Sequence, residues 1–397
     1  MIIVLASNFF NHHEKFFCDE ISKKPGVEFH FIQTMKMDEE RIKLGWGIDI
    51  SNIPYCSCSY GSKGEYTKAL ELCSTADVLI LGSAPYEFIA ERVKKNKLTF
   101  FYAERLFRNG LWHMLYPPTF FTVLKRFIIP GNKSNFYMLC ASGYTALDSH
   151  KIFAFRKKYF KWGHFIDVKQ FDSVDKLIDS KSEKNQKKVS VLWAGRFLKL
   201  KHPDMVIEVA DRLKQEGYDF DFNFIGSGEL EGSLRQEVKG RDFSEQVHFL
   251  GTMTPQEVRS YMERSQIYLF TSDFNEGWGA VLGEAMASGC AVVTSHGIGA
   301  TPFLAQHNEN ALVYETGNID SLYRNVKKLM DSESLRKRLS RNAIDTMQNL
   351  WNAKVGAERF YNVVKALING ESIPEYESGP MSKAELLKNN WFKDDTV

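Results

Sequence analysis

Short apolar segments that alternate with amphipathic ones constrain the fold of this chain more than any other feature. The alternation begins at the first residues and starts a second time near residue 189. Runs such as Ala76–Gly82 and Val189–Ala194 have the length and apolar content of buried strands. Strands that alternate with helices are typical of parallel, doubly wound sheets. We therefore expect an α/β chain with two such sheets.

The length of 397 residues also favours two domains, since one core rarely serves more than about 300 residues. A polar stretch at 179–188 reads as the linker between them. We expect four segments: a first Rossmann-like domain at 1–180, a second at 189–350, a long amphipathic helix at 351–369 and a polar tail without a defined fold at 370–397.

Positive charge is concentrated in one part of the chain. The net charge is only +2, which gives no indication of a nucleic-acid partner. Between residues 105 and 166, however, ten lysines and arginines accompany a single acidic residue, Asp148. Such a segment favours contact of one half of the chain with an anionic surface or ligand.

The cysteines and the hydropathy pattern argue against a metal protein, a secreted protein and a membrane-spanning protein. The six cysteines lack the paired spacing of a zinc site, and we expect no metal and no other cofactor. No run of eighteen apolar residues occurs, and the apolar run at Met1–Leu5 is too short for a secretory signal. We therefore expect a cytoplasmic protein with reduced thiols.

The segment from Leu111 to Pro130 breaks the alternation, because it is aromatic, apolar and basic and contains bracketing prolines. If it is exposed, this composition suits the interface of an anionic membrane, and the basic cluster at Arg156–Lys158 adds to it. If it is buried, it is a core helix with two solvated cations. The first alternative predicts a peripheral protein on the inner face of the membrane.

Two carboxylates eight positions apart, Glu276 and Glu284, mark the most informative stretch of the second half. On one helix their side chains would lie about 80° apart and about 12 Å along the axis. Gly277 and Gly279 would leave the first turn of that helix open to an anion. The stretch indicates a site for a phosphate-bearing ligand with hydroxyls, although a surface helix with two incidental glutamates has the same pattern.

Three further features follow expected strands of the second domain. Arg196 and Lys201 follow the first strand, where their charges could hold a diphosphate or simply be solvated. Gly226 and Gly228 form a strand-to-helix turn that can offer N–H groups to phosphate. The loop at Met253 could hold a flat ring by apolar contact, or could simply end a buried strand.

In this order the four features closely resemble the C-terminal half of the family 4 retaining glycosyltransferases, which have the GT-B fold of two Rossmann-like domains facing a central cleft. The resemblance is strong from Val189 to Thr301 and weak elsewhere. It implies transfer of a sugar from a UDP- or GDP-sugar with retention at the anomeric carbon. It also implies that the helix at 351–369 crosses back to the first domain.

The same resemblance implies roles for the motif residues. Arg196 and Lys201 would bind the donor diphosphate and act in catalysis together with Glu276, which would touch hydroxyls of the donor sugar. Glu284 would hold the ribose. The other donor-binding positions that the resemblance implies are Gly226, Gly228, Met253, Gly277, Trp278 and Gly279.

The first domain matches the family less well. The loop Ser7–His13 has no glycine, whereas many members have two there. Many members also place a histidine near the sugar late in this half, and Glu104 is one candidate for that position. Since ligands bind at the carboxyl ends of parallel strands, we expect His12, His13 and Glu104 on the acceptor or sugar side.

The resulting hypothesis is a retaining glycosyltransferase that acts on a lipid-linked glycan in surface polysaccharide synthesis, since Ala141-Ser142 and Lys161–Phe165 look like segments of such members. Two alternatives stay open: a nucleotide-sugar 2-epimerase of the same fold and a non-catalytic nucleotide-sugar-binding protein. A dinucleotide oxidoreductase is disfavoured, because no Gly-x-Gly-x-x-Gly follows the first strand.

Overall fold

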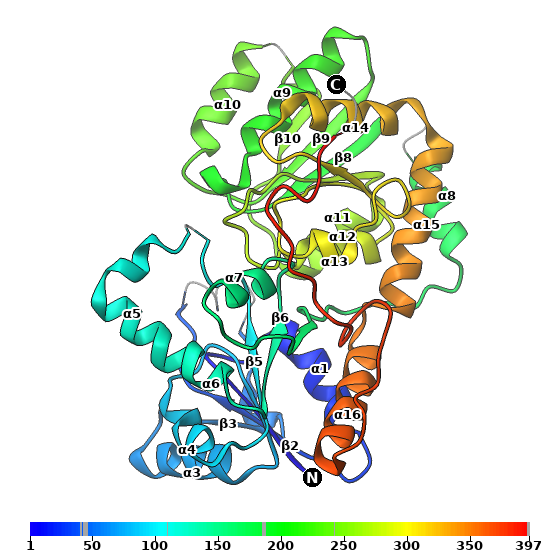
Figure 1. Cartoon of the computed structure of the whole chain (residues 1–397). Coiled ribbons are helices and arrows are strands. Elements are labelled where there is room, and N and C mark those ends of the chain that lie inside the picture. Colours follow the sequence, from blue (N-terminus) through cyan, green and yellow to red (C-terminus); the bar gives the residue numbers. More distant parts are fainter. Residues whose placement is uncertain (40–41, 43–46, 109, 185–187, 242, 395–397) are drawn as a thin grey trace. The chain divides into compact units, whose positions relative to one another are not determined.

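The computed structural model describes residues 1–39, 42, 47–108, 110–184, 188–241 and 243–394. The chain divides into two compact units. Unit 1 contains Met1–Ile166 and Trp351–Lys388, and unit 2 contains Asp167–Leu350 and Asn389–Val397. Each unit is built on a parallel sheet flanked by helices (Figure 1). The expected α/β class with two Rossmann-like domains is therefore confirmed.

Over the residues that the structure describes, the sheet of unit 1 has seven parallel strands in the order β3-β2-β1-β4-β5-β6-β7. The chain moves outward from β1 to β3 and then crosses to β4 on the other side of β1, which makes the junction of β1 and β4 the topological switch point. The strands are β1 (Ile2–Ser7), β2 (Glu28–Gln33), β3 (Cys56–Cys58), β4 (Val78–Leu81), β5 (Thr99–Ala103), β6 (Phe136–Cys140) and β7 (Tyr159–Lys161).

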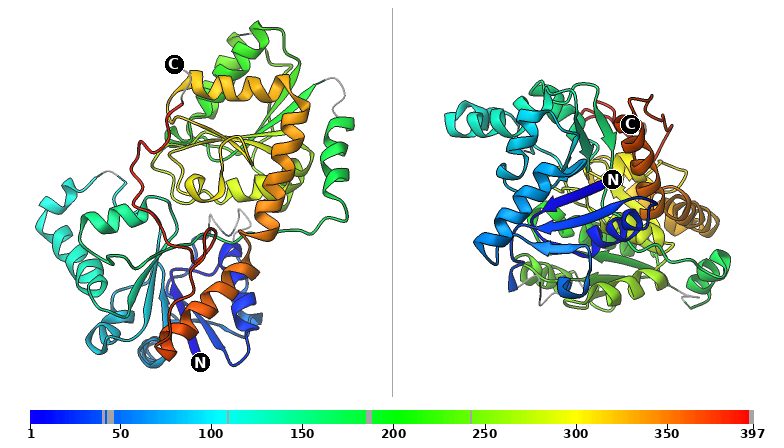
Figure 2. Two further views of the ribbon diagram at one scale, coloured as in Figure 1. Left: turned by 45° about the vertical axis from the view of Figure 1, so that its right-hand side comes forward. Right: turned by 90° about the horizontal axis from the view of Figure 1, so that it is seen from below.

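The long helix near the end of the chain belongs to unit 1 and lies beside the first helix (Figures 1 and 2). The ring of Phe360 in this helix packs edge-on against Phe17, with centroids 5.8 Å apart. The helical segments of unit 1 are α1 (His12–Ser22), η1 (Ile50–Asn52), α3 (Lys63–Thr75), α4 (Glu87–Lys95), η2 (Trp112–Leu115), α5 (Pro117–Val123), η3 (Leu124–Ile128), α6 (Ile129–Gly131), α7 (Thr145–Lys151) and α16 (Ala353–Asn369).

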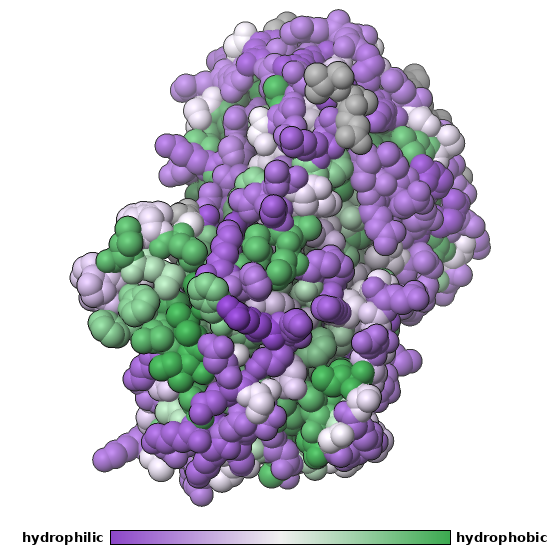
Figure 3. Space-filling view, in the orientation of Figure 1, coloured by the Kyte–Doolittle hydropathy of each residue, from purple (hydrophilic) through white to green (hydrophobic). Residues whose placement is uncertain are grey.

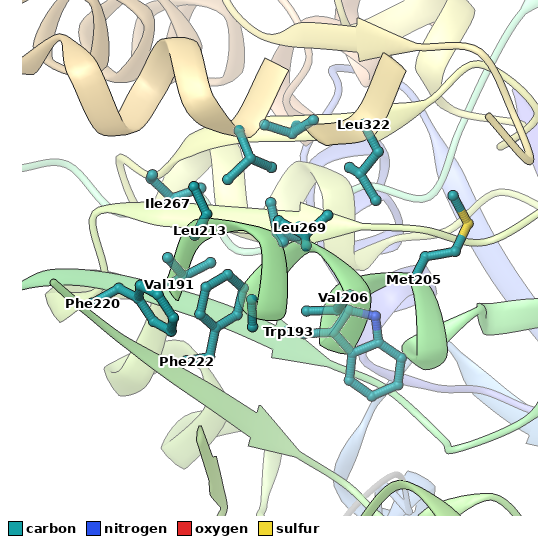
Figure 4. Packing of buried hydrophobic residues seen from close by; sticks show 14 of the residues in the cluster. Val191, Trp193, Met205, Val206, Leu213, Phe220, Phe222, Ile267, Leu269 and Leu322 are labelled. Atoms are coloured by element: carbon teal, nitrogen blue, oxygen red, sulfur yellow. The ribbon is translucent and has the colours of Figure 1, made fainter. Parts of the chain in front are cut away.

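The sheet of unit 2 has six parallel strands in the order β10-β9-β8-β11-β12-β13. Its strands are apolar because helices cover the sheet, and Val191, Phe222 and Leu269 pack in one core with Leu213 and Leu322 (Figure 4). The strands are β8 (Val189–Ala194), β9 (Phe220–Ile225), β10 (Val247–Phe249), β11 (Ile267–Phe270), β12 (Ala291–Ser295) and β13 (Leu312–Tyr314).

One helix of unit 2, α8, extends into the region expected to be a linker. The described helical segments of unit 2 are α8 (Val174–Lys184), η4 (Lys199–Lys201), α9 (Pro203–Gln215), α10 (Glu231–Gly240), α11 (Pro255–Arg264), α12 (Val281–Ala287), α13 (Thr301–Leu304), α14 (Ile319–Asp331) and α15 (Glu333–Asn349). Unit 2 therefore begins at Asp167 rather than after residue 180.

Lys181 explains why α8 packs on unit 2 despite its polar sequence. Its buried ammonium donates hydrogen bonds of 2.7–3.1 Å to four backbone carbonyls, those of Met262, Ser265, Ser288 and Gly289. These carbonyls lie at the carboxyl ends of α11 and α12, where helix dipoles favour a cation. Burial lowers the pKa of Lys181, because it disfavours the charged ammonium. The hydrogen bonds to these carbonyls stabilise the charged form against that effect.

The segment after α16 packs more closely than a polar tail was expected to. Met381 is 1% exposed, and its N–H donates to the carbonyl of Lys161 at 2.8 Å. Phe160 forms an antiparallel bridge with Lys383. Because β7 is the edge strand of the sheet, a polar segment can pair with its outer backbone groups without contributing many apolar side chains.

Candidate functional site

Two loops at the carboxyl ends of β8 and β9 are joined by backbone hydrogen bonds. The N–H of Gly195 donates to the carbonyl of Ile225 at 2.9 Å, and the N–H of Gly226 donates to the carbonyl of Gly251 at 2.8 Å. The second bond brings in the loop after β10. Three loops thus meet at the edge of the sheet where parallel α/β proteins bind ligands.

Gly226 and Gly228 permit this close approach. Both have positive φ, +128° and +154°, a region that side-chain-bearing residues rarely adopt. A Cβ on Gly226 would lie 2.0 Å from the carbonyl oxygen of Gly195, and one on Gly228 would lie 2.8 Å from the backbone of Phe197. The glycines are therefore required by backbone packing, whatever else they contact.

Lys201 and Glu276 form an ion pair across 75 residues of sequence. Their side chains are only 16% and 15% exposed, so the pair is largely shielded from solvent. The ammonium also lies 5.5 Å from the centre of the Phe270 ring. The hydroxyl of Thr271 donates to the backbone carbonyl of Lys201 at 2.5 Å and fixes the end of η4. The structure thus brings together two residues of separate sequence motifs, between which no direct contact was predicted.

Arg196 lies in the same β8 loop but is exposed. Its backbone carbonyl accepts a hydrogen bond from the N–H of Leu198 at 2.8 Å, which shapes the turn between Arg196 and η4. The loop therefore presents one solvent-exposed guanidinium and one shielded ammonium. A diphosphate could engage both cations.

The helix expected to cover both glutamates begins later than predicted. α12 starts at Val281, so Glu276, Gly277 and Gly279 lie in the preceding loop and do not form its first turn. Gly279 has φ +81°, which is incompatible with a right-handed helix. A Cβ there would also lie 2.8 Å from the ring of Phe270. The expected open helix turn, with its anion-attracting mouth, is therefore wrong.

Trp278 is a core residue, since its side chain is 2% exposed and packs near Phe303 with ring centroids 6.1 Å apart. Its carbonyl accepts a hydrogen bond from the N–H of Ala300 at 2.9 Å. Gly277 is also buried. Any contact of Trp278 with a ligand would thus involve its backbone.

Glu284 and Met253 are both partly buried. Burial raises the pKa of Glu284, and the charge of Arg259 opposes that shift. Met253 follows Thr252, whose hydroxyl donates to the hydroxyl of Ser227 at 3.1 Å and so joins the β10 and β9 loops. Both residues stay candidates for donor contacts.

Asp273 connects the two motifs and was missed by the sequence analysis. Its N–H donates to the carbonyl of Leu200 at 2.9 Å, and its carboxylate accepts from the N–H of Asn275 at 2.8 Å. The same carboxylate lies 3.3 Å from Nε2 of His202. Aspartate often accepts a hydrogen bond from the backbone N–H two residues later and so forms a turn. Asp273 itself was therefore the signal that the sequence offered for this turn.

A second polar cluster lies in unit 1. The ring centroids of His12 and His13 are 3.9 Å apart, and those of His13 and His164 are 5.7 Å apart. Nε2 of His164 is 3.3 Å from a carboxylate oxygen of Glu104, and its Nδ1 is 2.8 Å from the hydroxyl of Tyr102. The expected grouping of His12 and His13 with Glu104 is thus built through two residues that were not predicted, His164 and Tyr102.

Burial and charge divide the histidines of this cluster. Burial lowers the pKa of His13 well below its usual value, and the neighbouring histidines add to the effect. Burial alone would lower the pKa of His164, but the hydrogen bond and charge of Glu104 and the charge of Glu14 raise it overall. Burial raises the pKa of Glu14. The cluster can therefore hold a proton on His164 while His13 stays neutral.

The segment at 111–130 is largely exposed, so it is not the buried core helix of the second alternative. Large apolar side chains gather over η2 and α5 (Figure 3), with exposures of 39–86% at Trp112, Leu115, Tyr116, Phe120 and Phe121. Part of the positive charge is engaged elsewhere, because Arg105 is buried beside Asp148. Among the helices that the structure describes, none combines the length and apolarity needed to cross a membrane.

These features define a two-domain α/β protein of the GT-B class. Nearly the whole chain is similar in fold to the crystal structure of Alr3699/HepE from Anabaena in complex with UDP. The TM-score is 0.68 over 92% of this chain and 99% of that chain, at 12% identity, so the likeness shows the fold alone.

Residues 174–346 match the family model described as glycosyl transferases group 1. This range contains every motif from Arg196 to Glu284, and unit 2 therefore carries a domain of the glycosyl transferases group 1 family.

Two curated relatives match part of the chain. The amylovoran biosynthesis glycosyltransferase AmsK of Erwinia amylovora is 30% identical over 149 residues, 36% of each chain. An N-acetylgalactosaminyltransferase of Campylobacter jejuni, named for its undecaprenol-linked substrate, is 32% identical over 148 residues, 37% of this chain and 39% of the relative. The chain thus spans well under half of these relatives' length.

Proposed function

We propose that the chain is a retaining glycosyltransferase that moves a sugar from a nucleoside diphosphate sugar to an acceptor. The observation that carries this proposal is the Lys201–Glu276 ion pair, which holds a cation and a carboxylate together on the loops after β8 and β11. A donor of this class needs a positive group for its diphosphate and hydrogen-bond acceptors for its sugar hydroxyls.

The donor would lie along the loops of unit 2. Arg196 and Lys201 would bind the diphosphate, and the backbone at Gly226 and Gly228 would approach the nucleotide without side chains in the way. Glu284 would accept hydrogen bonds from the ribose. The base would lie against the loop at Met253, and Gly277, Trp278 and Gly279 would offer backbone N–H groups to the sugar or the phosphate.

The chemistry then depends on stabilising the leaving group. The bond from the anomeric carbon to the diphosphate oxygen breaks, and its electron pair stays on the nucleoside diphosphate. The ammonium of Lys201 and the guanidinium of Arg196 stabilise that negative charge. The acceptor oxygen attacks on the face that the diphosphate leaves, and its proton passes to the departing phosphate. Configuration at the anomeric carbon is thereby retained without a metal ion.

Glu276 would position the sugar that reacts. Its carboxylate holds the ammonium of Lys201 in the structure, and it retains free lone pairs that can accept from sugar hydroxyls. A bound diphosphate would share the ammonium with it. Donor binding and sugar orientation are coupled in this way through one lysine.

Unit 1 would supply the acceptor or sugar side. His12, His13 and Glu104 lie in the cluster around His164, where charged and neutral groups alternate over short distances. Such a cluster can bind hydroxyls of a glycan acceptor by accepting and donating hydrogen bonds.

A lipid-linked glycan is the acceptor that the surface of unit 1 suits best. The exposed aromatic side chains of η2 and α5 resemble groups that partition into a membrane interface, and the segment from 105 to 166 is basic. The names of AmsK and of the Campylobacter relative support a polysaccharide or undecaprenol-linked product. Flotation with anionic liposomes should carry the protein upward, and loss of that association in Phe121→Ser but not in Ile368→Ser would locate the surface.

The experiment that tests the function starts with the donor. A panel of UDP- and GDP-sugars should include one that raises the melting temperature, because a ligand that binds only the native state stabilises it. With that donor, Arg196→Ala should abolish transfer without changing the fold, whereas Arg338→Ala, an exposed arginine of α15, should not. An epimer formed without acceptor would indicate a 2-epimerase instead, and near-wild-type turnover by Arg196→Ala would exclude its assigned role.

A further inference from the structure

The last described residues of the chain return to unit 2 after the segment in unit 1. Trp391 donates a hydrogen bond from Nε1 to the carbonyl of His296 at 3.3 Å, and Asp394 forms an ion pair with Arg324 at 2.8 Å. The ring of Phe392 lies 5.2 Å from that of His307. Residues 389–394, which we call the C-terminal clamp, are thus attached to unit 2 at several points.

His296 of unit 2 is contacted by three residues of the clamp, Asn389, Trp391 and Phe392. Its Nε2 is 2.9 Å from the carbonyl of Asn389, an acceptor only, so Nε2 must carry the proton. Its Nδ1 is 2.9 Å from the N–H of Thr316, a donor only, so Nδ1 must be unprotonated. The clamp and the end of β13 therefore fix the orientation and the tautomer of one imidazole between them.

On its other side, His296 packs against the loop that carries Glu276. The ring of Phe274 meets the imidazole edge-on, with centroids 5.2 Å apart. A Cβ on Gly297 would lie 3.1 Å from the backbone nitrogen of Phe274, which shows how closely the two backbones approach. Phe274 is two residues before Glu276, so the contact lies at the base of the proposed sugar-positioning loop.

The rest of the turn from His296 to Ala300 supports the same loop further along. The N–H of Ala300 donates to the carbonyl of Trp278 at 2.9 Å. Ile298 is fully buried, and its side chain would lie 3.0 Å from a Cβ placed on Gly279. The turn thus supports the loop from 274 to 279 at both of its ends.

We propose that the C-terminal clamp is a positioning element for the nucleotide-sugar site, which acts on the loop 274–279 through His296. The identity of the ligand rests on the proposed function, whereas the ordering of the loop does not. His296 and Trp391 are positioning residues in this proposal. The clamp contacts His296 directly, and His296 directly contacts Phe274, which is two residues before Glu276. Through these contacts the two residues would fix the position of Glu276.

The first test measures loop order without any ligand. Hydrogen–deuterium exchange of peptides that cover 273–280 and 296–300 should become faster in a chain that ends at Lys388 and in Trp391→Ala. The matched control is Leu386→Ala, an exposed apolar residue of the same C-terminal stretch that belongs to unit 1. Equal exchange in all four proteins would overturn the proposal, whether or not a nucleotide binds.

The second test uses UDP and GDP as probes. By calorimetry at a temperature where every variant is folded, the shortened chain and Trp391→Ala should bind the recognised nucleotide about tenfold more weakly than the wild type and Leu386→Ala. With a turnover assay, the donor KM should rise in the same variants. His296→Gln keeps a hydrogen-bond donor for the Asn389 carbonyl, so its nucleotide affinity should fall less than that of His296→Ala.

The outcomes separate the two proposals. If the wild type binds neither UDP nor GDP, the proposed function fails, and the exchange experiment alone decides whether the clamp orders the loop. If the wild type binds and the variants bind within twofold of it, the clamp proposal is wrong while the function stands. A lower melting temperature with unchanged exchange, affinity and KM would mean that the clamp only adds stability.

Discussion

The loops of unit 2 that we propose bind the donor and the histidine cluster of unit 1 are two polar sites built in different ways. In unit 2 the backbone does most of the construction, with glycines at positive φ and hydrogen bonds between loops. In unit 1 the site is formed by titratable side chains. His13 packs near His164, and His164 lies beside Glu104. Both lie where strands of a parallel sheet end.

This difference determines how each site should respond to change. A backbone-built site tolerates little added volume, but its geometry depends weakly on pH. A site built from neighbouring ionisable groups keeps its shape when one group is altered, but its charge state changes with pH. Predictions about volume, charge and pH therefore test the contrast directly, and we order them by the size of the expected effect.

The largest effect should come from adding one methyl group to the backbone-built site. Gly226→Ala would place a Cβ 2.0 Å from the carbonyl oxygen of Gly195, at φ +128°. We expect it to destabilise unit 2 by more than about 2 kcal/mol and to abolish nucleotide binding, since the β8 and β9 loops must separate. Urea unfolding and calorimetric titration with UDP and GDP would measure both.

Gly232→Ala is the matched control for that change. Gly232 lies in α10, and nothing lies within 4 Å of a Cβ placed on it. Its replacement should change stability by less than about 1 kcal/mol, because alanine favours helices. If Gly226→Ala behaved like Gly232→Ala, the site of unit 2 would not be built by close backbone approach.

A somewhat smaller effect should follow from removing the shielded charge of the proposed donor site. Lys201→Met keeps the length and apolar stem of the side chain but leaves Glu276 without its cation. We expect kcat to fall about 100-fold, because the leaving diphosphate loses a preorganised positive charge. A turnover assay with the identified donor would measure it.

Lys199→Met tests whether position matters as much as charge. Lys199 lies in the same short helix, η4, but is exposed. Its replacement should leave kcat close to the wild-type value. Equal losses in the two variants would mean that the general positive potential of the loop, rather than the ion pair with Glu276, supports the reaction.

The same contrast explains how much the sequence could predict of the fold. Strand β8 has the predicted bounds, because it is an almost entirely apolar run between polar segments. The edge strands β3 and β7 have three residues each and were missed, since so short a run carries no periodicity. The second half of α8 was assigned to a linker because its composition is polar, and the hydrogen bonds of Lys181 that attach it to unit 2 are visible only in the fold.

For the sites, the sequence pointed to candidate residues only where the signal is contiguous in sequence. The motifs of unit 2 are short patterns of glycine and charge, and the structure brings the loops that carry them together at the ends of neighbouring strands. His164 and Tyr102 in unit 1, and His296 in unit 2, gave no such signal, because only the fold brings them to their partners. The helix start at Val281 was missed because the positive φ of Gly279, which interrupts the helix, is visible only in three dimensions.

The smallest effect, and the one that best separates the two sites, is the pH dependence of unit 1. The pKa of His164 is raised above its usual 6.5, so its stabilising contribution is full below pH 6.5 and is lost as pH rises through its folded-state pKa. The pKa of His13 is lowered from the same value, so its contribution is present above pH 6.5 and is lost as pH falls. Unfolding by urea between pH 5 and 9 should give a stability maximum near neutrality from these two groups.

Replacing each histidine should remove one side of that maximum. His164→Gln should flatten the decline on the alkaline side, and His13→Gln should flatten the decline on the acid side, so each variant is the control for the other. The hydrogen bond of His164 to a carboxylate contributes about 1.5–3 kcal/mol when both are charged, so the first variant should also be less stable at pH 6. If both variants kept the wild-type profile, the cluster would hold its shape by packing, as the loops of unit 2 do, and the contrast between the two sites would disappear.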